Sequence, residues 1–350
     1  MKTGLREIIN RDCEEVVAPA APRLDMLKNR LVYITGGTGF VGTWISEAVA
    51  FLNDQFRFNT CLILVSRNPD SFREKAPHLA SRKDIELLSL NVKNIFEIPS
   101  DVSYIIHAAA SPDNRQHVSD PLDVMQTITS GTGALLDTAT GLTGLKKILN
   151  ISSGQIYGRQ LCDMEAIPES YAGSLDCNSI NSVYPESKRY AETLCCAYWS
   201  LYKVPVVIAR PFAFIGPYLP LDRPWALNNF IRDALMNKTI RIIGNGLPVR
   251  SYMYPSDMAV WMLRILIEGA AGAAYNVGSP YSISLRELAE KVKLHSQTAS
   301  SILIKNLNDD KSKVIPDITR SRTQLALDVG ISVDEAIKRS IVWYRNIKLS

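Results

Sequence analysis

Tyr184 and Lys188 lie four residues apart in the segment from Val183 to Glu192. In a helix, residues at positions i and i+4 lie on the same face. A lysine ammonium close to a phenol favours the phenolate, so this spacing predicts that the pKa of Tyr184 falls below its ordinary value. A tyrosine with such a pKa can take a proton from an alcohol or return it. The pair therefore predicts proton transfer at a hydroxyl group.

A glycine-rich turn near the start of the chain indicates that a dinucleotide cofactor takes part in the reaction. The run 31–35 is apolar, as in a buried strand, and the segment 43–52 has a helical apolar pattern. Between them, glycines spaced G-x-x-G-x-x-G permit a tight turn and let a dinucleotide pyrophosphate approach the helix N-terminus. An ordinary strand-to-helix turn is the alternative. The cofactor-binding residues expected in this turn are Gly36, Thr38, Gly39, Phe40, Val41 and Gly42.

The residues after the second expected strand, 61–65, bear on the choice between NAD and NADP. An acid there would bind the adenosine ribose 2′-hydroxyl of NAD, whereas an arginine accommodates the 2′-phosphate of NADP. The chain has Ser66 and Arg67 in place of an acid. These two residues favour NADP as the cofactor, with NAD and a merely solvated arginine as the alternatives.

Length and composition limit the class of protein. The 350 residues can form two domains, or one large α/β domain with an elaboration. The apolar content is 46% and the net charge is +4, with lysines and arginines spread along the chain, so nucleic acid is not an expected partner. No apolar run is long enough for a membrane span. The six cysteines form no C-x-x-C pair and only four histidines are present, so we expect no metal site and reduced core thiols in a cytoplasmic protein.

The order of elements predicts an α/β fold with a Rossmann-type, doubly wound parallel sheet. Helical patterns separate most of the expected strands, which lie at 31–35, 61–65, 85–90, 103–107, 147–152 and 205–210. The fourth of these strands ends in His107, and Ala108 and Ala109 follow with small side chains that leave room for a flat cofactor. His107 either contacts the cofactor or has a structural role.

The rest of the chain is expected to form two further parts. Residues 1–29 alternate in charge and lack an apolar signal core, which predicts an extra helix or tail packed outside the nucleotide-binding fold, for example at a subunit contact. Prolines and glycines crowd the segment after residue 211, where we expect a crossing into a second lobe with a helix at 228–237 and a strand at 241–243. The predicted units are an extension at 1–29, a Rossmann domain at 30–212 with a return near 255–270, and a substrate domain at 213–254 and 271–350.

Ser153 comes directly after the expected strand 147–152. In a doubly wound sheet, such strand ends line the ligand crevice. We predict that the Ser153 hydroxyl bonds the reacting oxygen and shares its proton with Tyr184, with a turn-capping serine as the alternative. The expected reaction is a hydride transfer in which Tyr184 takes the proton of an alcohol. Lys188 would stabilise the phenolate and bond the nicotinamide ribose.

With these residues the chain resembles the extended short-chain dehydrogenases/reductases of the nucleotide-sugar epimerase/dehydratase family, from about Arg30 to about Leu288. The matching motifs lie at 35–42, 107–110, 131–132, 152–158, 184–188, 210–212, 216–218 and 250–257. The resemblance implies a Rossmann domain, a smaller C-terminal domain that binds a nucleoside-diphosphate sugar, and a homodimer. It places Arg250 on the substrate diphosphate, because a guanidinium matches phosphate oxygens, and Asn229 beside it.

Four positions depart from the family pattern. Gln155 stands where the dehydratases and decarboxylases of the family carry a glutamate, and a glutamine cannot act as a general acid. Ala213 and Ile128 replace frequent asparagines, so contacts to the sugar or the phosphates must differ. Asn91 replaces an aspartate that often meets adenine.

The leading prediction is an NAD(P)-dependent enzyme that transiently oxidises C4 of a nucleotide-linked hexose, most simply an epimerase. The serine motif at 152–158 resembles that of the sugar 4-epimerases. Arg67 instead favours an NADPH-dependent 4-keto-sugar reductase. A non-catalytic dinucleotide-sensing protein is a further alternative, although a sensor has no need of Ser153, Tyr184 and Lys188.

Overall fold

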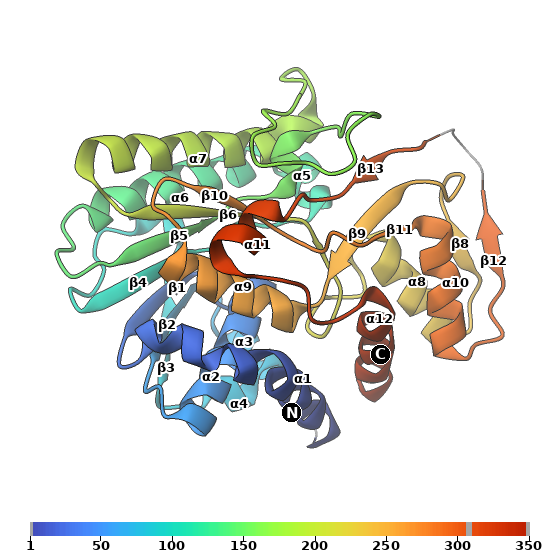
Figure 1. Ribbon diagram of the computed structural model, residues 1–350, viewed down its shortest axis with the longest axis horizontal. Coiled ribbons are helices and arrows are strands. Elements are labelled where there is room, and N and C mark those ends of the chain that lie inside the picture. Colours follow the sequence, from blue (N-terminus) through green and yellow to red (C-terminus); the bar gives the residue numbers. More distant parts are fainter. Residues whose placement is uncertain (1–2, 306–309, 348–350) are drawn as a thin grey trace.

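A seven-stranded, wholly parallel sheet forms the centre of the computed structural model, which describes residues 3–305 and 310–347 (Figure 1). Its strand order is β10-β6-β5-β4-β1-β2-β3, so the chain starts in the middle and winds outward in both directions. The predicted doubly wound α/β fold is confirmed. The strands are β1 (Leu31–Thr35), β2 (Cys61–Ser66), β3 (Ile85–Ser89), β4 (Val102–His107), β5 (Lys147–Ile151), β6 (Val206–Pro211) and β10 (Ala274–Val277).

The six strands expected from the sequence are all present, and each end lies within one residue of its expected position. The seventh strand, β10, was missed because it is a run of only four residues. It pairs in parallel with β6 at the edge of the sheet.

Helices cover both faces of the sheet, as alternating side chains of the strands require. Val32 and Ile34 of β1 belong to one apolar core, whereas Tyr33 between them belongs to a second core on the opposite face. The first face packs against α2 (Phe40–Phe56) and α9 (Pro255–Glu268), and the second against α6 (Pro121–Ala139) and α7 (Val183–Tyr202) (Figure 1). Shorter elements on the connections are α3 (Asp70–Lys75), α4 (Pro77–Ala80), α5 (Asn114–Ser119), η2 (Val92–Asn94), η3 (Gly154–Tyr157) and η4 (Ile180–Ser182).

The N-terminal extension is a helix, α1 (Thr3–Ala20), followed by η1 (Ala21–Leu27). The expected extra helix is present, and it packs against α2 and α9 of the nucleotide-binding part. One face of α1 is buried in the same core as Trp44 of α2 and Met258 of α9. Charges at the exposed positions of α1 concealed an apolar stripe in the sequence, formed by Leu5, Ile8, Ile9, Cys13 and Val17.

The C-terminal part forms a smaller lobe around strand β9, at the right of Figure 1. β9 pairs antiparallel with β11 and parallel with β13 and β7, while β8 and β12 form a separate parallel pair. The strands are β7 (Ala213–Phe214), β8 (Ile240–Ile242), β9 (Val249–Met253), β11 (Ser282–Ser284), β12 (Ile302–Ile304) and β13 (Lys313–Val314). Its helices are α8 (Ala226–Leu235), α10 (Leu285–Ser296) and α12 (Val333–Asn346), so the expected helix and strand of this region are present, shifted by one or two residues. The remaining helix, α11 (Thr319–Leu325), packs against β10 and α9 of the central part.

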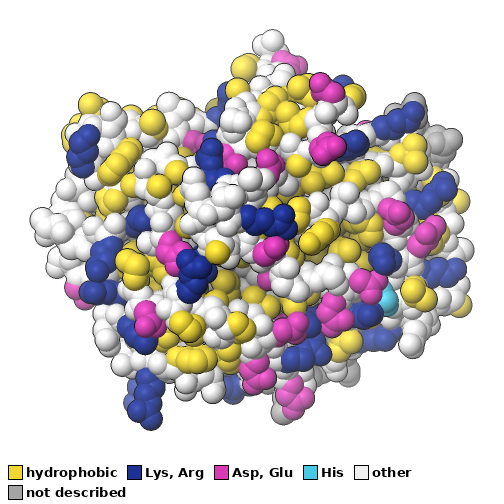
Figure 2. Space-filling view, in the orientation of Figure 1, with side chains coloured by type: hydrophobic (Ala, Val, Ile, Leu, Met, Phe, Trp, Pro, Cys, Tyr) yellow, Lys and Arg dark blue, Asp and Glu magenta, His cyan; other side chains and the backbone are white. Residues whose placement is uncertain are grey.

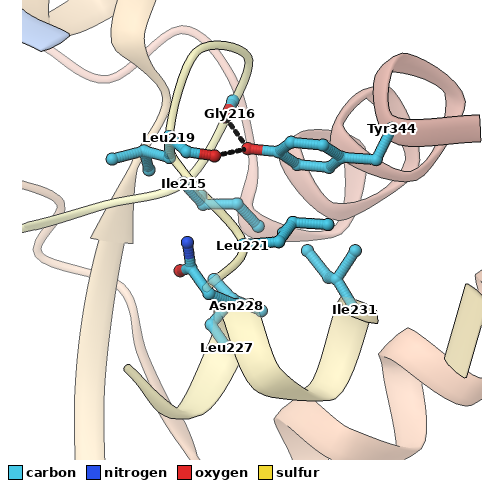
Figure 3. Close-up of a pocket in the computed structure, with 8 residues that line it drawn as sticks. All are labelled: Ile215, Gly216, Leu219, Leu221, Leu227, Asn228, Ile231 and Tyr344. Atoms are coloured by element: carbon cyan, nitrogen blue, oxygen red, sulfur yellow. Dashed lines mark hydrogen bonds between the residues drawn. The ribbon is translucent and has the colours of Figure 1, made fainter. Parts of the chain in front are cut away.

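The segment that enters this lobe is held by one tyrosine of the last helix. The buried hydroxyl of Tyr344 lies 2.9 Å from the carbonyl oxygen of Gly216 and 2.5 Å from that of Leu219 (Figure 3). Leu221, Leu227 and neighbouring side chains close the space below the ring, which has no room for a water molecule. This contact fixes the crossing between the two parts of the chain.

Charges of both signs are interspersed over the face shown in Figure 2. Within 3–305 and 310–347, no helix has the length and apolarity needed to cross a bilayer. All six cysteines are free thiols, but only Cys13 and Cys195 are buried, so the expectation of core thiols holds for two of the six.

A buried ion pair fastens α1 to α12. The carboxylate of Asp12 has no exposed surface; it accepts hydrogen bonds from the Tyr254 hydroxyl at 2.5 Å and from the Arg339 guanidinium at 2.8 Å. Burial raises the pKa of Asp12 to about 6, against the opposing effects of these partners. Arg339 also binds Glu15 at 2.6 Å, so a single side chain of α12 holds two acids of α1.

We predict that Arg339→Met lowers the free energy of unfolding by about 3 kcal/mol, because it leaves the Asp12 carboxylate buried without its closest cation. The matched control is Lys338→Met on the same helix. Its ammonium is 48% exposed and pairs with Asp334 and Glu335 at the surface, so the loss should stay below about 1 kcal/mol. Urea denaturation measures both values, and equal losses in the two variants would contradict the buried ion pair.

Candidate functional site

The glycine-rich turn between β1 and α2 is packed so closely that side chains are excluded. Gly36 has a φ of +65°, and a Cβ atom there would lie 2.7 Å from the Ala108 carbonyl oxygen. A Cβ atom on Gly42 would lie 2.2 Å from the carbonyl oxygen of Gly37. Gly39 precedes the first residue of α2 and has no side chain to cap the helix, which leaves the first N–H groups of α2 open to an anion. This cradle fits the pyrophosphate of a dinucleotide.

Lys75 adds a positive charge behind this turn, and the sequence analysis missed it. Its ammonium donates to the Thr38 carbonyl oxygen at 3.2 Å and to the Thr43 hydroxyl at 2.9 Å. Burial lowers the pKa of Lys75 to about 8, partly offset by the charge of Glu47. No sequence signal marks the residue, because it comes from α3, more than thirty residues after the turn.

Ala108 and Ala109 follow β4 and remain half-buried beside the turn. His107, just before them, has a structural role. Its ring is 3% exposed, with Nδ1 2.8 Å from the Thr35 hydroxyl and Nε2 3.1 Å from the Thr132 hydroxyl. Burial, and then the charge of Lys188, lower the pKa of His107 to about 3, so the ring is neutral at physiological pH. It joins β4 to β1 and α6.

Ser153 and Tyr184 meet at the carboxyl edge of the sheet. Ser153 begins η3 just after β5 and accepts the backbone N–H of Gln155 at 3.1 Å. Its side chain lies close enough to the Tyr184 phenol to oppose the rise of the phenol's pKa, and the two residues are only 6% and 5% exposed. The structure thus brings this predicted pair close together, although the capping role foreseen as the alternative is present as well.

The expected effect of Lys188 on Tyr184 is wrong. Burial raises the pKa of Tyr184 to about 12, opposed only by the Ser153 side chain. The Lys188 amine lies 5.9 Å from the centre of the phenol ring and donates to the Ile151 carbonyl oxygen at 2.6 Å. One helical turn therefore places the amine over the ring rather than at the hydroxyl. Burial also lowers the pKa of Lys188 to about 8.

His117 is a further residue that the sequence analysis missed. It lies on α5, and its ring stacks on Tyr184 with centroids 4.5 Å apart and planes 6° from parallel. Its Nε2 lies 2.8 Å from the Ser111 carbonyl oxygen, so this nitrogen carries a proton. A six-residue helix gives too short a pattern to reveal which of its side chains points at the site.

Asp113 holds the start of α5 against the C-terminal part of the chain. Its carboxylate caps α5 through the Arg115 N–H, binds the Arg115 guanidinium at 2.8 Å and also binds Arg223. The Arg115 side chain is the main cause that keeps the pKa of Asp113 well below its ordinary value. Arg223 precedes α8 in the C-terminal part, so the Asp113 carboxylate joins the two lobes. Asp113 lies only four residues before His117 in the sequence.

The residues expected at the adenosine ribose both have protein partners. The Ser66 side-chain oxygen accepts hydrogen bonds from the Thr38 hydroxyl at 2.8 Å and from the Asn68 backbone N–H at 3.2 Å. Arg67 pairs with Asp123 of α6 at 3.6 Å. Asn91 caps η2 by accepting the Lys93 backbone N–H at 3.1 Å.

The predicted substrate-binding residues lie in the C-terminal part, apart from this group. Arg250 on β9 donates to the Val249 and Ser312 carbonyl oxygens at 2.9 and 3.0 Å. Asn229 is half-buried on α8. In the described part of the chain, no hydrogen bond or ion pair joins either residue to Ser153, Tyr184 or Lys188. Their roles on a substrate stay predictions.

Two hollows of the molecule lie away from this group. One is the narrow space below Tyr344, and the other is a depression of about 440 Å³ between the ends of α8, α10 and α12. Neither is lined by a residue predicted for the site. Chemistry, rather than cavity size, therefore locates the candidate site at the edge of the sheet.

Comparison with known proteins gives a family match that covers most of the chain. The model of the NAD dependent epimerase/dehydratase family matches residues 32–278. UDP-glucuronic acid decarboxylase 1 of Arabidopsis thaliana is 29% identical over 320 residues, which are 91% of this chain and 71% of that protein. Residue 32 is the second residue of β1 and residue 278 follows β10, so the matched region contains all of the central sheet except Leu31.

Solved structures of the same fold cover both lobes. An epimerase from Methanothermobacter thermautotrophicus superimposes with a TM-score of 0.80 at 20% identity, covering 93% of this chain and 95% of that one. UDP-glucose 4-epimerase of Thermotoga maritima, solved with UDP-glucose, gives a TM-score of 0.76 at 19% identity, with 91% and 99% covered. At this identity the similarity establishes the fold.

We predict that Gly42→Ala weakens NAD binding at least about tenfold and lowers the melting temperature, because the added methyl group must displace the Gly37 backbone. Gly133→Ala in α6 is the matched control. A Cβ atom there would lie 3.9 Å from its nearest neighbour, a methyl group of Leu194, so alanine should leave NAD affinity unchanged and raise helix stability. Isothermal calorimetry and thermal unfolding give both quantities, and equal NAD affinities in the two variants would contradict the cradle.

We also predict that stability depends on pH through Lys188. Its folded-state pKa of about 8 lies below the ordinary lysine value, so between these values the unfolded chain binds a proton that the folded protein does not. The free energy of unfolding of the protein, relative to that of Lys188→Met, should therefore rise by on the order of 1–3 kcal/mol from pH 8 to pH 10.5. Denaturant titrations at the two pH values test this, and a constant or falling difference would show that the buried amine does not titrate in this range.

Proposed function

The chain belongs to the NAD dependent epimerase/dehydratase family, and from this membership we propose that it transiently oxidises C4 of a nucleoside-diphosphate hexose and acts as an epimerase. The observation that carries the proposal is the closeness of the Ser153 side chain to the buried phenol of Tyr184, with Lys188 one turn away. These side chains lie where β5 ends, two strands from the glycine cradle that follows β1. A proton acceptor and a dinucleotide site thus share one edge of the sheet.

Each residue has a defined part in this reaction. Bound in the cradle, NAD would supply the hydride acceptor. Tyr184 takes the proton of the C4 hydroxyl and later returns it, while Ser153 holds the reacting oxygen through its own hydroxyl. Because burial raises the pKa of Tyr184 to about 12, its phenol is protonated at physiological pH before the cofactor binds. As proton acceptor it needs positive charge near its hydroxyl; because Lys188 lies over the ring instead, oxidised NAD would have to supply that charge when bound.

Gln155 favours epimerisation over dehydration. Its exposed side chain follows Ser153 by two residues, and an amide cannot give or take the proton that elimination of water requires. Epimerisation needs no acid at this position, since the same proton and hydride return to the sugar. NADPH-dependent reduction, which Arg67 favoured, has weaker support because the guanidinium is paired with Asp123.

Decarboxylation of a nucleotide-linked uronic acid is the second candidate. The similarity to UDP-glucuronic acid decarboxylase 1 over 91% of the chain favours it. A C4 ketone lies β to a C5 carboxylate, so it can accept the electron pair released with carbon dioxide without an acid at Gln155. The same Ser153, Tyr184 and Lys188 would carry out the oxidation that precedes this loss.

Product analysis separates these reactions. The purified protein is incubated with UDP-glucose or UDP-glucuronic acid in the presence of NAD, and products are identified by NMR and mass spectrometry. A C4 epimer of unchanged mass supports the epimerase, whereas loss of carbon dioxide supports the decarboxylase. Tight NAD binding without turnover of any nucleotide sugar would leave the non-catalytic sensor as the explanation.

We predict that Tyr184→Phe lowers turnover by about a hundredfold to ten-thousandfold, because it removes the proton-transfer group. NAD affinity should change little, since the substitution deletes one oxygen atom and keeps the ring stacked on His117. Tyr190→Phe on the same helix is the control, because that ring is 53% exposed and should leave turnover unchanged. Near-normal turnover of Tyr184→Phe would remove this residue from the reaction.

A further inference from the structure

Asp123, Arg67 and Lys93 form a charge cluster at one end of the sheet, called here the ribose-edge cluster. The Asp123 carboxylate lies 2.8 Å from the Lys93 ammonium and 3.6 Å from the Arg67 guanidinium. Arg67 follows β2, Lys93 lies in η2 after β3, and Asp123 is in the first turn of α6. Three separate elements therefore deliver one carboxylate and two cations to a single place.

The position of this cluster gives it a connection with the cofactor. In doubly wound folds, the adenosine ribose is recognised at the end of the second strand, by an acid for NAD or an arginine for NADP. Here β2 ends at Ser66, whose side-chain oxygen already accepts two hydrogen bonds from Thr38 and Asn68. Arg67 is the next residue, and Asp123 is its ion-pair partner. The charge at this edge is therefore the sum over the cluster, not the charge of Arg67 alone.

We propose that Asp123 replaces the acid missing from the end of β2 and makes the protein select NAD over NADP. The inference rests on the proposed function only in requiring that the protein binds a nicotinamide dinucleotide. A 2′-phosphate would meet the Asp123 carboxylate and would have to take Arg67 and Lys93 from it. A ribose with free hydroxyl groups meets no such repulsion, and its hydroxyls can donate to a carboxylate.

The environment of Asp123 keeps the carboxylate ionised. The hydrogen bond from Lys93 and the charges of Lys93 and Arg67 hold its pKa below the ordinary range. The side chain is 39% exposed, so it is held in place and can still be reached by a ligand. Removing its charge would leave two cations side by side, which is the arrangement that favours a phosphate.

The test measures binding directly and needs no turnover. Dissociation constants for NAD and NADP are determined by calorimetry for the protein and for Asp123→Asn. We expect the protein to bind NAD more tightly, and the ratio of the NADP to the NAD dissociation constant to fall about tenfold in Asp123→Asn. Asp120→Asn is the matched control. Asp120 starts the same helix by accepting the Asp123 backbone N–H at 3.4 Å, and asparagine also caps helices well, so the ratio should not change.

A second pair of variants identifies the cations. Arg67→Gln in the Asp123→Asn background should abolish the gained NADP affinity, whereas Arg67→Gln alone should make the protein discriminate more strongly against NADP. Tighter binding of NADP than of NAD by the unsubstituted protein would overturn the proposal. So would a ratio in Asp123→Asn within about twofold of the original, or an equal change in Asp120→Asn. Correct selectivity without turnover of a nucleotide sugar would instead count against the proposed function alone.

Discussion

A buried amine at the carboxyl edge of the sheet is the constraint on which the candidate site depends. Lys188 is 4% exposed, and a polar group in such surroundings must find a hydrogen-bond partner. It finds the carbonyl oxygen of Ile151, the last residue of β5. This bond fixes how α7 lies on the sheet, and one helical turn earlier the same helix then presents Tyr184 to Ser153, just beyond the end of β5.

The acid strength of Tyr184 depends on segments from both parts of the chain. His117 covers one face of the phenol, and α5, which carries His117, begins at a carboxylate shared by Arg115 and Arg223. Arg223 belongs to the segment between β7 and α8, in the C-terminal part. Since burial is the largest influence on the pKa of Tyr184, the contact between the two lobes helps to set the proton affinity of the site.

The sequence was sufficient for features whose signal is local. Six of the seven central strands and the glycine turn follow from short motifs on regular elements. Long-range features were out of reach: the apolar face of α1, the stacking of His117 and the position of Lys75 depend on how distant segments pack. The predicted fall in the pKa of Tyr184 was wrong for the same reason. Helical spacing shows which residue is a neighbour, but it does not show how deeply the phenol is buried.

The same distinction applies to the charge that a cofactor meets. The sequence motif considers only the residue after β2, which is Arg67. By itself, an arginine there favours the 2′-phosphate of NADP. The field at that point also includes Asp123 and Lys93, which reach it from α6 and η2. Charges a few ångströms apart act together, so an arginine that shares a carboxylate with a lysine is not equivalent to an isolated arginine. Cofactor preference is therefore a property of the folded edge, and the residue that decides it can lie far along the chain from the motif.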